Sequence, residues 1–126
     1  MQLSSLTGVS PIDGRYARHT EALRPWFSEY ALIKHRVLVE VRWLQMLVSP
    51  SGLSHLEPLS DSARRALDAI VDEFSIEDAA RIKAIESETN HDVKAVEYFL
   101  REKVLADDSL AYTSNYIHFA CTSEDI

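Results

Sequence analysis

The sequence contains little cysteine, glycine or proline, and each scarcity narrows the class of protein. With a single cysteine, Cys121, no disulfide can form within the chain, and a zinc site made of cysteine pairs is excluded. We therefore expect a reducing compartment, the cytoplasm. Only 3 glycines and 4 prolines occur, and good helix formers dominate between Ser28 and Leu105. This composition predicts an all-α fold.

Long apolar runs and clusters of positive charge are also missing. No run reaches the ~18 apolar residues that a membrane span requires, and the N-terminus lacks the basic and apolar regions of a secretion signal. The net charge is −7, with acidic and basic residues mixed along the chain. Because no Lys/Arg run could neutralise a row of phosphates, we expect no nucleic acid as a partner, and the lack of a long apolar run argues against a membrane.

Metal and nucleotide motifs are absent as well. The 5 histidines form no His-x-x-His or His-Glu-x-x-His pair, which leaves little support for a metal site. The glycine patterns of phosphate loops and dinucleotide-binding folds do not occur.

Apolar residues recur at helical spacing along most of the chain. The longest pattern begins after Ser28, a predicted N-cap. Further helices are predicted after Ser60, after Ser75, and from Asp92, and Ser75 with Asp78 forms a capping-box pattern. Four aromatic residues on or near the apolar stripes are expected in the core: Trp26, Trp43, Tyr98 and Phe99.

Two segments interrupt the helical pattern. Residues Ser10 to Gly14 are typical of a turn, and Arg15 and Tyr16 follow it directly. Near the end, Thr113 to Ala120 predicts a short helix, and Thr122 to Asp125 predicts the cap and first turn of another. Because the chain stops where that last helix begins, we expect it to be truncated.

Three polar clusters fall at predicted helix starts or in loops. They are Arg15-Tyr16, Asn90-His91-Asp92 and Thr122-Ser123. Helix N-termini and hydroxyls donate hydrogen bonds, and arginine binds phosphate or carboxylate bidentately, so the clusters suit a small, multiply anionic ligand. Taken singly, each also has an ordinary structural interpretation as a cap or a surface pair. His91 fits either a general acid or base or a residue that only packs and hydrogen-bonds.

Taken together and in order, these clusters resemble bacterial adenylosuccinate lyases of the fumarase/aspartase superfamily. The resemblance rests on Leu3 to Thr7 with Ser10 to Tyr16, and on the stretches EVRWLQ (40–45), TNHDVKAVEYFL (89–100) and IHFACTSEDI (117–126). It is weakest over residues 49–61 and 105–115, and Glu88 stands where a second threonine is expected. It implies the N-terminal helical domain of that fold over residues 1–111, with 112–126 as the truncated start of the central helical bundle.

The resemblance also implies a reaction, namely β-elimination of fumarate without a metal or organic cofactor. Adenylosuccinate would give AMP, and the succinylated imidazole carboxamide ribotide (SAICAR) would give AICAR. Substrate binding is implied for Arg15, Tyr16, Asn90, His91, Asp92, Thr122 and Ser123. The first two would bind the nucleotide phosphate, the next three would line the pocket, and the last two would hold a carboxylate of the succinyl group.

The family's catalytic acid and base, a histidine and a serine, would lie beyond residue 126. His91 would therefore support catalysis, and the chain alone is predicted to be inactive. The family's homotetramers share each active site between subunits. Two other interpretations stay open: another lyase of the superfamily, acting on argininosuccinate, fumarate or aspartate, and a non-catalytic helical interaction module. Arg15-Tyr16 and the stretch 89–100 favour the purine branch.

Overall fold

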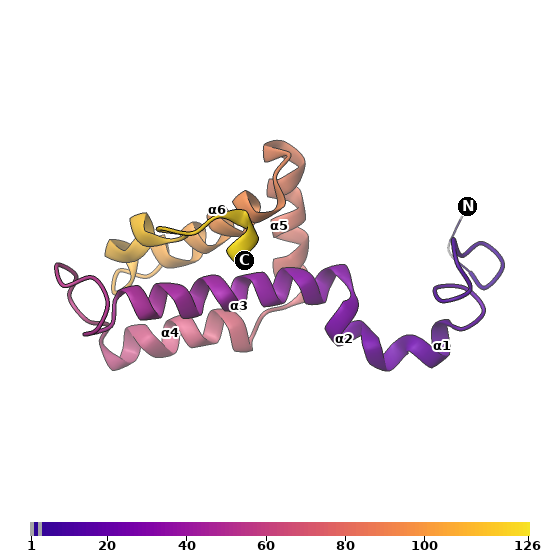
Figure 1. Ribbon diagram of the computed structural model, residues 1–126, viewed down its shortest axis with the longest axis horizontal. Coiled ribbons are helices and arrows are strands. Elements are labelled where there is room, and N and C mark those ends of the chain that lie inside the picture. The colour runs from indigo at the N-terminus through magenta and orange to yellow at the C-terminus, as the bar shows by residue number, and fades with distance from the viewer. Residues whose placement is uncertain (1, 3) are drawn as a thin grey trace. The chain divides into compact units, whose positions relative to one another are not determined.

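The computed structural model describes residue 2 and residues 4–126, and divides the chain into two compact units, Met1–Leu32 and Ile33–Ile126 (Figure 1). Leu3, the first residue of the resembling stretches, lies outside the described residues. Every regular element in the described part is a helix, which confirms the predicted all-α class. None of these helices combines the length and apolar character needed to cross a lipid bilayer.

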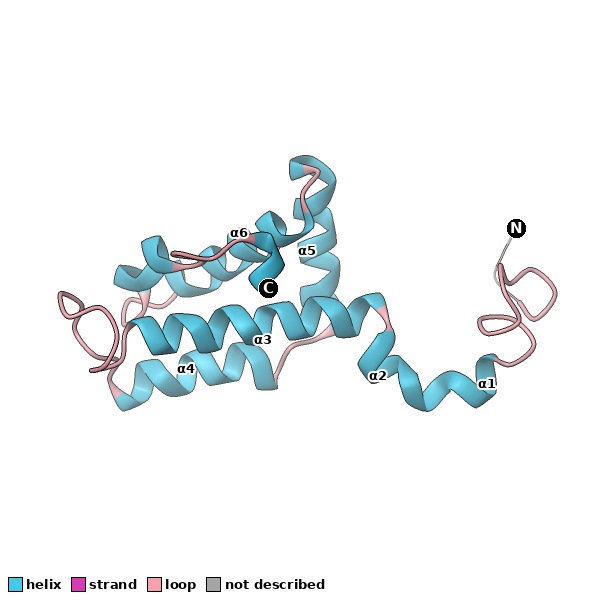
Figure 2. Ribbon diagram, viewed as in Figure 1, coloured by secondary structure: helices cyan, strands magenta, loops and turns pink. Residues whose placement is uncertain are grey.

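The N-terminal unit contains short helices and the second unit contains the longer ones (Figure 2). The first unit holds α1 (Ala17–Thr20), the 3-10 helix η1 (Glu21–Leu23), α2 (Arg24–Phe27) and the first turn of α3 (Glu29–Leu47). The second holds the rest of α3, α4 (Asp61–Asp72), α5 (Ile76–Thr89), α6 (Asp92–Leu105) and the 3-10 helices η2 (Ala111–Tyr116) and η3 (Ser123–Asp125).

Side-chain caps fix where the main helices begin, as the sequence predicts. Ser28 and Ser60 each accept a hydrogen bond of 3.2 Å from the N–H three residues further on. At Ser75 the capping box is complete: its hydroxyl accepts from the Asp78 N–H at 3.1 Å, and the Asp78 carboxylate accepts from the Ser75 N–H at 3.0 Å. Each bond satisfies an N–H that the helix would leave unpaired.

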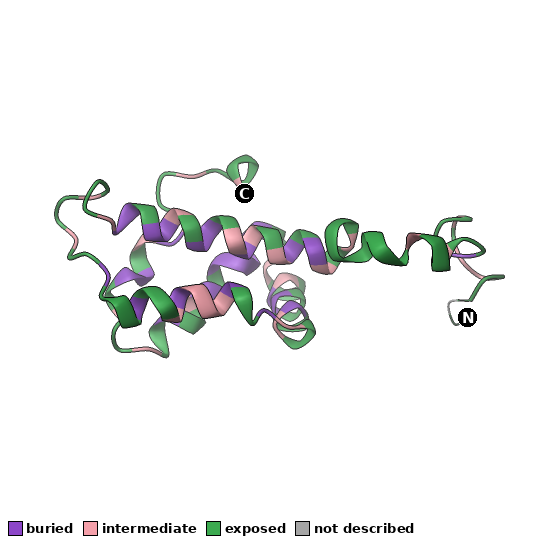
Figure 3. Cartoon of the chain, turned by 90° about the horizontal axis from the view of Figure 1, so that it is seen from below, coloured by how far each residue is buried: buried purple, intermediate pink, exposed green. Residues whose placement is uncertain are grey.

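In the second unit, α3 and α4 lie side by side and run in opposite directions, while α5 is steeply inclined to both (Figures 1 and 3). Each of these helices carries buried positions at intervals along its length (Figure 3). An ion pair between Arg42 and Asp68 joins α3 to α4, and the rings of Phe74 and Phe99 meet edge to face with centroids 6.1 Å apart. The fully buried core side chains include Val37, Val41, Leu67, Ile82, Val93, Phe99 and Leu100.

Two sequence-based expectations are wrong. Of the four aromatic residues expected in the core, Trp26 is 66% exposed and Tyr98 is 44% exposed, whereas Trp43 is partly buried and Phe99 is buried. Tyr98 precedes Phe99 by one position, so it points about 100° away around the helix. In place of the short helix expected from Thr113 to Ala120 there is the 3-10 helix η2, which ends at Tyr116. No right-handed helix reaches Ala120, because His118 and Ala120 are left-handed.

Replacing Leu67 with alanine should destabilise the fold by roughly 2–5 kcal/mol, because its side chain is completely buried and its loss leaves a cavity. The matched control is Leu105→Ala, which truncates a half-exposed leucine at the end of α6 and should change the free energy of unfolding by less than about 1 kcal/mol. Urea unfolding followed by circular dichroism measures both. Equal effects of the two substitutions would contradict the described core.

Candidate functional site

Arg15 and Tyr16 follow a loop that is closed by two glycines. A Cβ on Gly8 would lie 2.7 Å from the Cα of Gly14, so only glycine permits this approach of the two backbone segments. The Tyr16 N–H donates to the carbonyl of Pro11 at 2.8 Å, which confirms the predicted turn. The Arg15 guanidinium lies 4.9 Å from the centre of the Tyr16 ring, and both side chains are exposed. The turn thus presents a cation stacked on an aromatic ring.

The same turn is held by Asp13. Its carboxylate accepts the N–H of Ser10 at 2.7 Å and the N–H of Val9 at 3.2 Å. These hydrogen bonds, led by that of Ser10, lower the pKa of Asp13. The carboxylate therefore stays ionised and keeps the turn closed just before Arg15.

Asn90 and His91 form the tight corner between α5 and α6. Asn90 has φ 52°, a left-handed conformation that asparagine tolerates well, and its N–H donates to the Glu86 carbonyl at 2.8 Å to end α5. His91 is extended and caps α6, because its Nδ1 accepts the N–H of Lys94 at 3.2 Å. The corner therefore fixes both the backbone and the ring of His91.

This cap determines which nitrogen of His91 carries the proton. Since Nδ1 accepts a hydrogen bond, the neutral ring is protonated at Nε2. The side chain is 48% exposed, so the Nε2–H group can reach a ligand. An imidazolium would carry a second proton at Nδ1 and would lose the cap. In the tautomer that makes the cap, His91 thus presents its Nε2–H as a hydrogen-bond donor.

Asp92, the first residue of α6, is held by Arg36 of α3. The Arg36 Nη1 donates to the Asp92 carboxylate at 2.6 Å, and the other carboxylate oxygen accepts the Val93 N–H at 2.8 Å. These bonds, with that of Arg36 the largest, lower the pKa of Asp92. The Nε of Arg36 is buried and has no hydrogen-bond partner within the described part of the chain. Arg36 thus joins α3 to the start of α6.

Thr122 and Ser123 open the 3-10 helix η3. The Thr122 hydroxyl donates to the Glu124 carboxylate at 2.9 Å and accepts the Glu124 N–H at 3.3 Å. The Thr122 N–H donates to the Asp125 carboxylate at 2.8 Å, which confirms the predicted cap. Ser123 is exposed. The donors of Thr122 therefore already bind carboxylates of the chain itself, and an external carboxylate would have to displace them.

The sequence analysis did not identify a buried ionisable cluster on α3 and α6. Glu40 is 1% exposed, and its Oε1 lies 2.5 Å from the Nδ1 of His118. The other oxygen of Glu40 accepts the His118 N–H at 3.2 Å. Burial raises the pKa of Glu40, and the hydrogen bond from His118 opposes that effect. A carboxylate within the apolar stripe of Val37, Val41 and Leu44 was the available signal.

The cluster continues from His118 to α6. The His118 Nε2 lies 3.8 Å from the carboxylate of Glu97, which is also buried and binds the Lys94 ammonium at 2.8 Å. Two carboxylates thus face one imidazole and one ammonium. Buried carboxylates are tolerated where hydrogen-bonding or cationic partners of this kind face them.

The three predicted clusters are divided between the two units of the chain. Arg15 and Tyr16 belong to the N-terminal unit, and the other five candidate residues belong to the second unit. Within the described residues, no hydrogen bond or ion pair links the 90–92 corner directly to Thr122 or Ser123. That the seven residues form one pocket stays a prediction.

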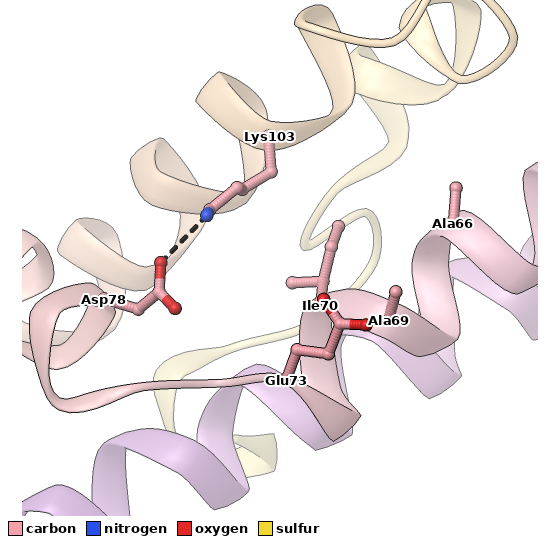
Figure 4. Close-up of a pocket in the computed structure, with 6 residues that line it drawn as sticks. All are labelled: Ala66, Ala69, Ile70, Glu73, Asp78 and Lys103. Carbon is pink, nitrogen blue, oxygen red and sulfur yellow. Dashed lines mark ion pairs between the residues drawn. The ribbon is translucent and has the colours of Figure 1, made fainter.

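The hollows of the second unit match the candidate residues only in part. One of about 230 Å³ lies between α4 and the α5–α6 pair and contains the Asp78–Lys103 ion pair at 2.8 Å (Figure 4). Neither charge there is free, because Asp78 also completes the α5 cap and Lys103 lies over Phe99. A second hollow, of about 330 Å³, is lined by Asn90. Among the described residues, no group of three His, Cys, Asp or Glu side chains could hold a metal ion.

Comparison with known proteins defines the class. A family model described as a lyase matches residues 14–126, which include all seven candidate residues. The chain therefore belongs to this lyase family.

Over all 126 residues the chain is 60% identical to the adenylosuccinate lyase of Escherichia coli strain K12, 57% to that of Haemophilus influenzae and 56% to that of Vibrio cholerae. In each case it spans 28% of the relative's length. The resemblance to adenylosuccinate lyases is confirmed.

Replacing Arg36 with glutamine should raise the pKa of Asp92 toward its ordinary value of 3.8. Because the folded pKa is lowered, the stabilisation by Asp92 is present above that value and is lost as the pH falls through the folded pKa. The variant should therefore lose stability near neutral pH and lose less on acidification than the parent protein. Unfolding free energies at about pH 6 and about pH 3 measure this difference.

The control is Arg65→Gln on the exposed side of α4. If both variants showed the same pH dependence of stability, the ion pair between Arg36 and Asp92 would not be its cause.

Proposed function

We propose that the chain is part of an adenylosuccinate lyase and contributes to its substrate site. The full protein would release fumarate from adenylosuccinate to give AMP, and from SAICAR to give AICAR. One observation carries the proposal: identity of up to 60% with proteins of that name runs through all 126 residues and so includes all three polar clusters. The chain spans 28% of those relatives, so the reaction is proposed for the whole protein.

The charges of the substrate account for the types of residue in the proposed site. A nucleotide phosphate needs a cation, and Arg15, stacked on Tyr16, supplies one from an exposed turn. A succinyl carboxylate needs hydrogen-bond donors, and Thr122 with Ser123 supplies hydroxyls and N–H groups. The donors of Thr122 bind Glu124 and Asp125 in this structure, which supports their affinity for carboxylates. Substrate binding would exchange one carboxylate for another.

The 90–92 corner would line the pocket between these two ends of the substrate. Asn90 offers an amide, and His91 offers an Nε2–H whose orientation is fixed by the cap on α6. Asp92 is ionised and held by Arg36, so it accepts hydrogen bonds from substrate hydroxyl or amino groups. The corner therefore combines donors and an acceptor on a rigid backbone.

The elimination needs three kinds of group. A base removes a proton from carbon, the C–N bond breaks as the C=C bond of fumarate forms, and an acid protonates the departing nitrogen. Donors must stabilise the negative charge that develops on the neighbouring carboxylate. In this proposal the base and the acid come from residues outside these 126, and His91 supports them by hydrogen bonding. Neither a metal nor an organic cofactor takes part.

The proposal has consequences for assembly and location. The protein would act as a cytoplasmic homotetramer with each active site shared between subunits, and residues 112–126 would lead into the central helical bundle. Small-molecule substrates and products would be its ligands: adenylosuccinate, SAICAR, AMP and fumarate. A different lyase of the superfamily would instead act on argininosuccinate, fumarate or aspartate, and an interaction module would act on none of them.

Replacing His91 with asparagine should separate its chemical role from its role as a cap. Asparagine offers an amide oxygen close to the position of Nδ1 and is a good N-cap, but it has no imidazole. In the full-length protein we expect kcat/KM for adenylosuccinate to fall about 100-fold or more in both His91→Asn and His91→Ala, because both lose the imidazole. Only the alanine variant should also lose about 1 kcal/mol of stability. Fumarate formation followed by ultraviolet absorbance, with calorimetry, measures the two effects.

The matched control is Ser60→Ala, which removes the cap of α4 and should cost about 1 kcal/mol without changing turnover. Full activity in His91→Asn would contradict a role of the imidazole in catalysis and would show that His91 acts only as a cap. Activity on argininosuccinate or aspartate in place of adenylosuccinate would move the protein to another branch of the superfamily. No activity on any of these substrates would favour the interaction module.

The 126-residue chain on its own should release no fumarate from adenylosuccinate, because the acid and the base are proposed to lie outside it. The measurement is the same absorbance assay at high protein concentration, with the full-length protein as the positive control. Fumarate release by the purified chain would show that a described residue acts as acid or base and would overturn this assignment.

A further inference from the structure

A short segment of chain, residues 117–121, leads directly into Thr122 and Ser123, and its backbone conformation is unusual. His118 and Ala120 have φ values of 61° and 62°, in the left-handed region that residues with a side chain seldom adopt. Such conformations cost free energy and persist only where surrounding contacts impose them. The conformation of residues 117–121 therefore needs an external cause.

Two residues of α3 supply that cause. The Glu40 carboxylate binds the N–H of His118 at 3.2 Å and its ring Nδ1 at 2.5 Å, so one side chain grips both the backbone and the side chain of the strained residue. Three positions further along α3, the Trp43 Nε1 donates to the Phe119 carbonyl at 2.8 Å. The segment is thus tied to one face of α3 at two consecutive residues.

The grip of Glu40 is the stronger of the two. Its side chain is fully buried, and a buried carboxylate without its partner would be very costly, so the pair with His118 opens far less readily than a surface ion pair. Glu97 faces the other ring nitrogen of His118 and is itself bound by Lys94. One ring nitrogen is therefore hydrogen-bonded to α3, and the other lies 3.8 Å from a carboxylate of α6.

We propose that Glu40 is a positioning residue: through His118 it fixes residues 117–121 and so sets where Thr122 and Ser123 stand. This inference rests on the proposed function, in which these two residues hold a carboxylate of the substrate. It predicts that loss of the Glu40 charge weakens substrate binding more than it slows the chemical step, because the acid and base lie elsewhere.

The test is Glu40→Gln in the full-length protein, assayed with adenylosuccinate. Glutamine keeps the shape and an acceptor oxygen but loses the charge that grips the ring. We expect KM to rise roughly tenfold, the scale of one lost hydrogen bond to a charged group, with kcat changed by less than about threefold. Glu40→Asp, which retains the charge on a shorter side chain, should recover part of the affinity.

Two local readouts do not depend on activity. Hydrogen exchange of the amides of residues 118–122, measured by mass spectrometry, should accelerate in Glu40→Gln while the rest of the protein is unchanged. Cys121 is the second reporter: burial and the nearby Glu40 charge raise the pKa of its thiol, so loss of that charge should speed its alkylation. The matched control is Glu102→Gln on α6, which removes an exposed ion pair with Arg81 and should change none of these quantities.

The outcomes separate the inference from the proposed function. An inactive parent protein overturns the proposed function, and the exchange and alkylation rates still test the grip of Glu40. An active parent protein with unchanged KM and unchanged exchange in Glu40→Gln overturns the inference. Faster exchange throughout the molecule with a proportional fall in kcat also overturns it, since that result describes a general loss of stability. If Glu40→Gln does not fold, Trp43→Phe serves as the second variant, because it removes the hydrogen bond to Phe119 without touching a buried charge. It should raise KM and speed local exchange, each by less than Glu40→Gln would. No change in either quantity overturns the inference.

Discussion

The second unit depends on the burial of one charged side chain. Glu40 lies on the apolar face of α3, where a carboxylate is tolerated only if a partner comes to it. That partner is His118, and the backbone at His118 is left-handed. A right-handed helix cannot continue through left-handed residues, and η3 begins only after them, at the cap made by Thr122. The buried contact between Glu40 and His118 therefore joins α3 to residues 117–121.

A second charged pair lies one turn earlier on α3, and it gives the helix a wider role. Arg36 and Glu40 are four positions apart and so lie on the same side of α3. Arg36 holds Asp92 at the start of α6, and Glu40 holds His118 shortly before Thr122. The 90–92 cluster and the chain leading into Thr122 are therefore both bound to the same helix, α3. Hydrophobic packing alone would hold the helices together but would not fix the positions of Asp92 and His118 relative to α3.

The sequence predicts what local chemistry determines and misses what depends on distant contacts. The starts of α4, α5 and α6 follow from residues within one turn of each cap, so Ser60, Ser75 and Asp92 could be placed from the sequence alone. Glu40 and His118 are separated by 78 positions, and no local pattern pairs them. The exposure of Tyr98 was missed for a related reason: apolar periodicity assigns a stripe, whereas the neighbouring helices decide how far around the helix burial extends.

From the sequence, His91 could be explained either as a structural residue or as a chemical group. In the structure the two roles are compatible. An imidazole has two distinct nitrogens, and the cap on α6 uses only Nδ1. The same hydrogen bond fixes the ring and leaves Nε2 facing away from the cap as a possible donor. Capping is therefore what orients the group that would meet a ligand. Thr122 combines the two roles less independently, because its hydroxyl serves Glu124 both as donor and as acceptor, so a ligand there must compete with the cap. Of the two polar clusters in the second unit, the 90–92 corner would bind a ligand without rearranging, whereas Thr122 would first have to release Glu124 and Asp125.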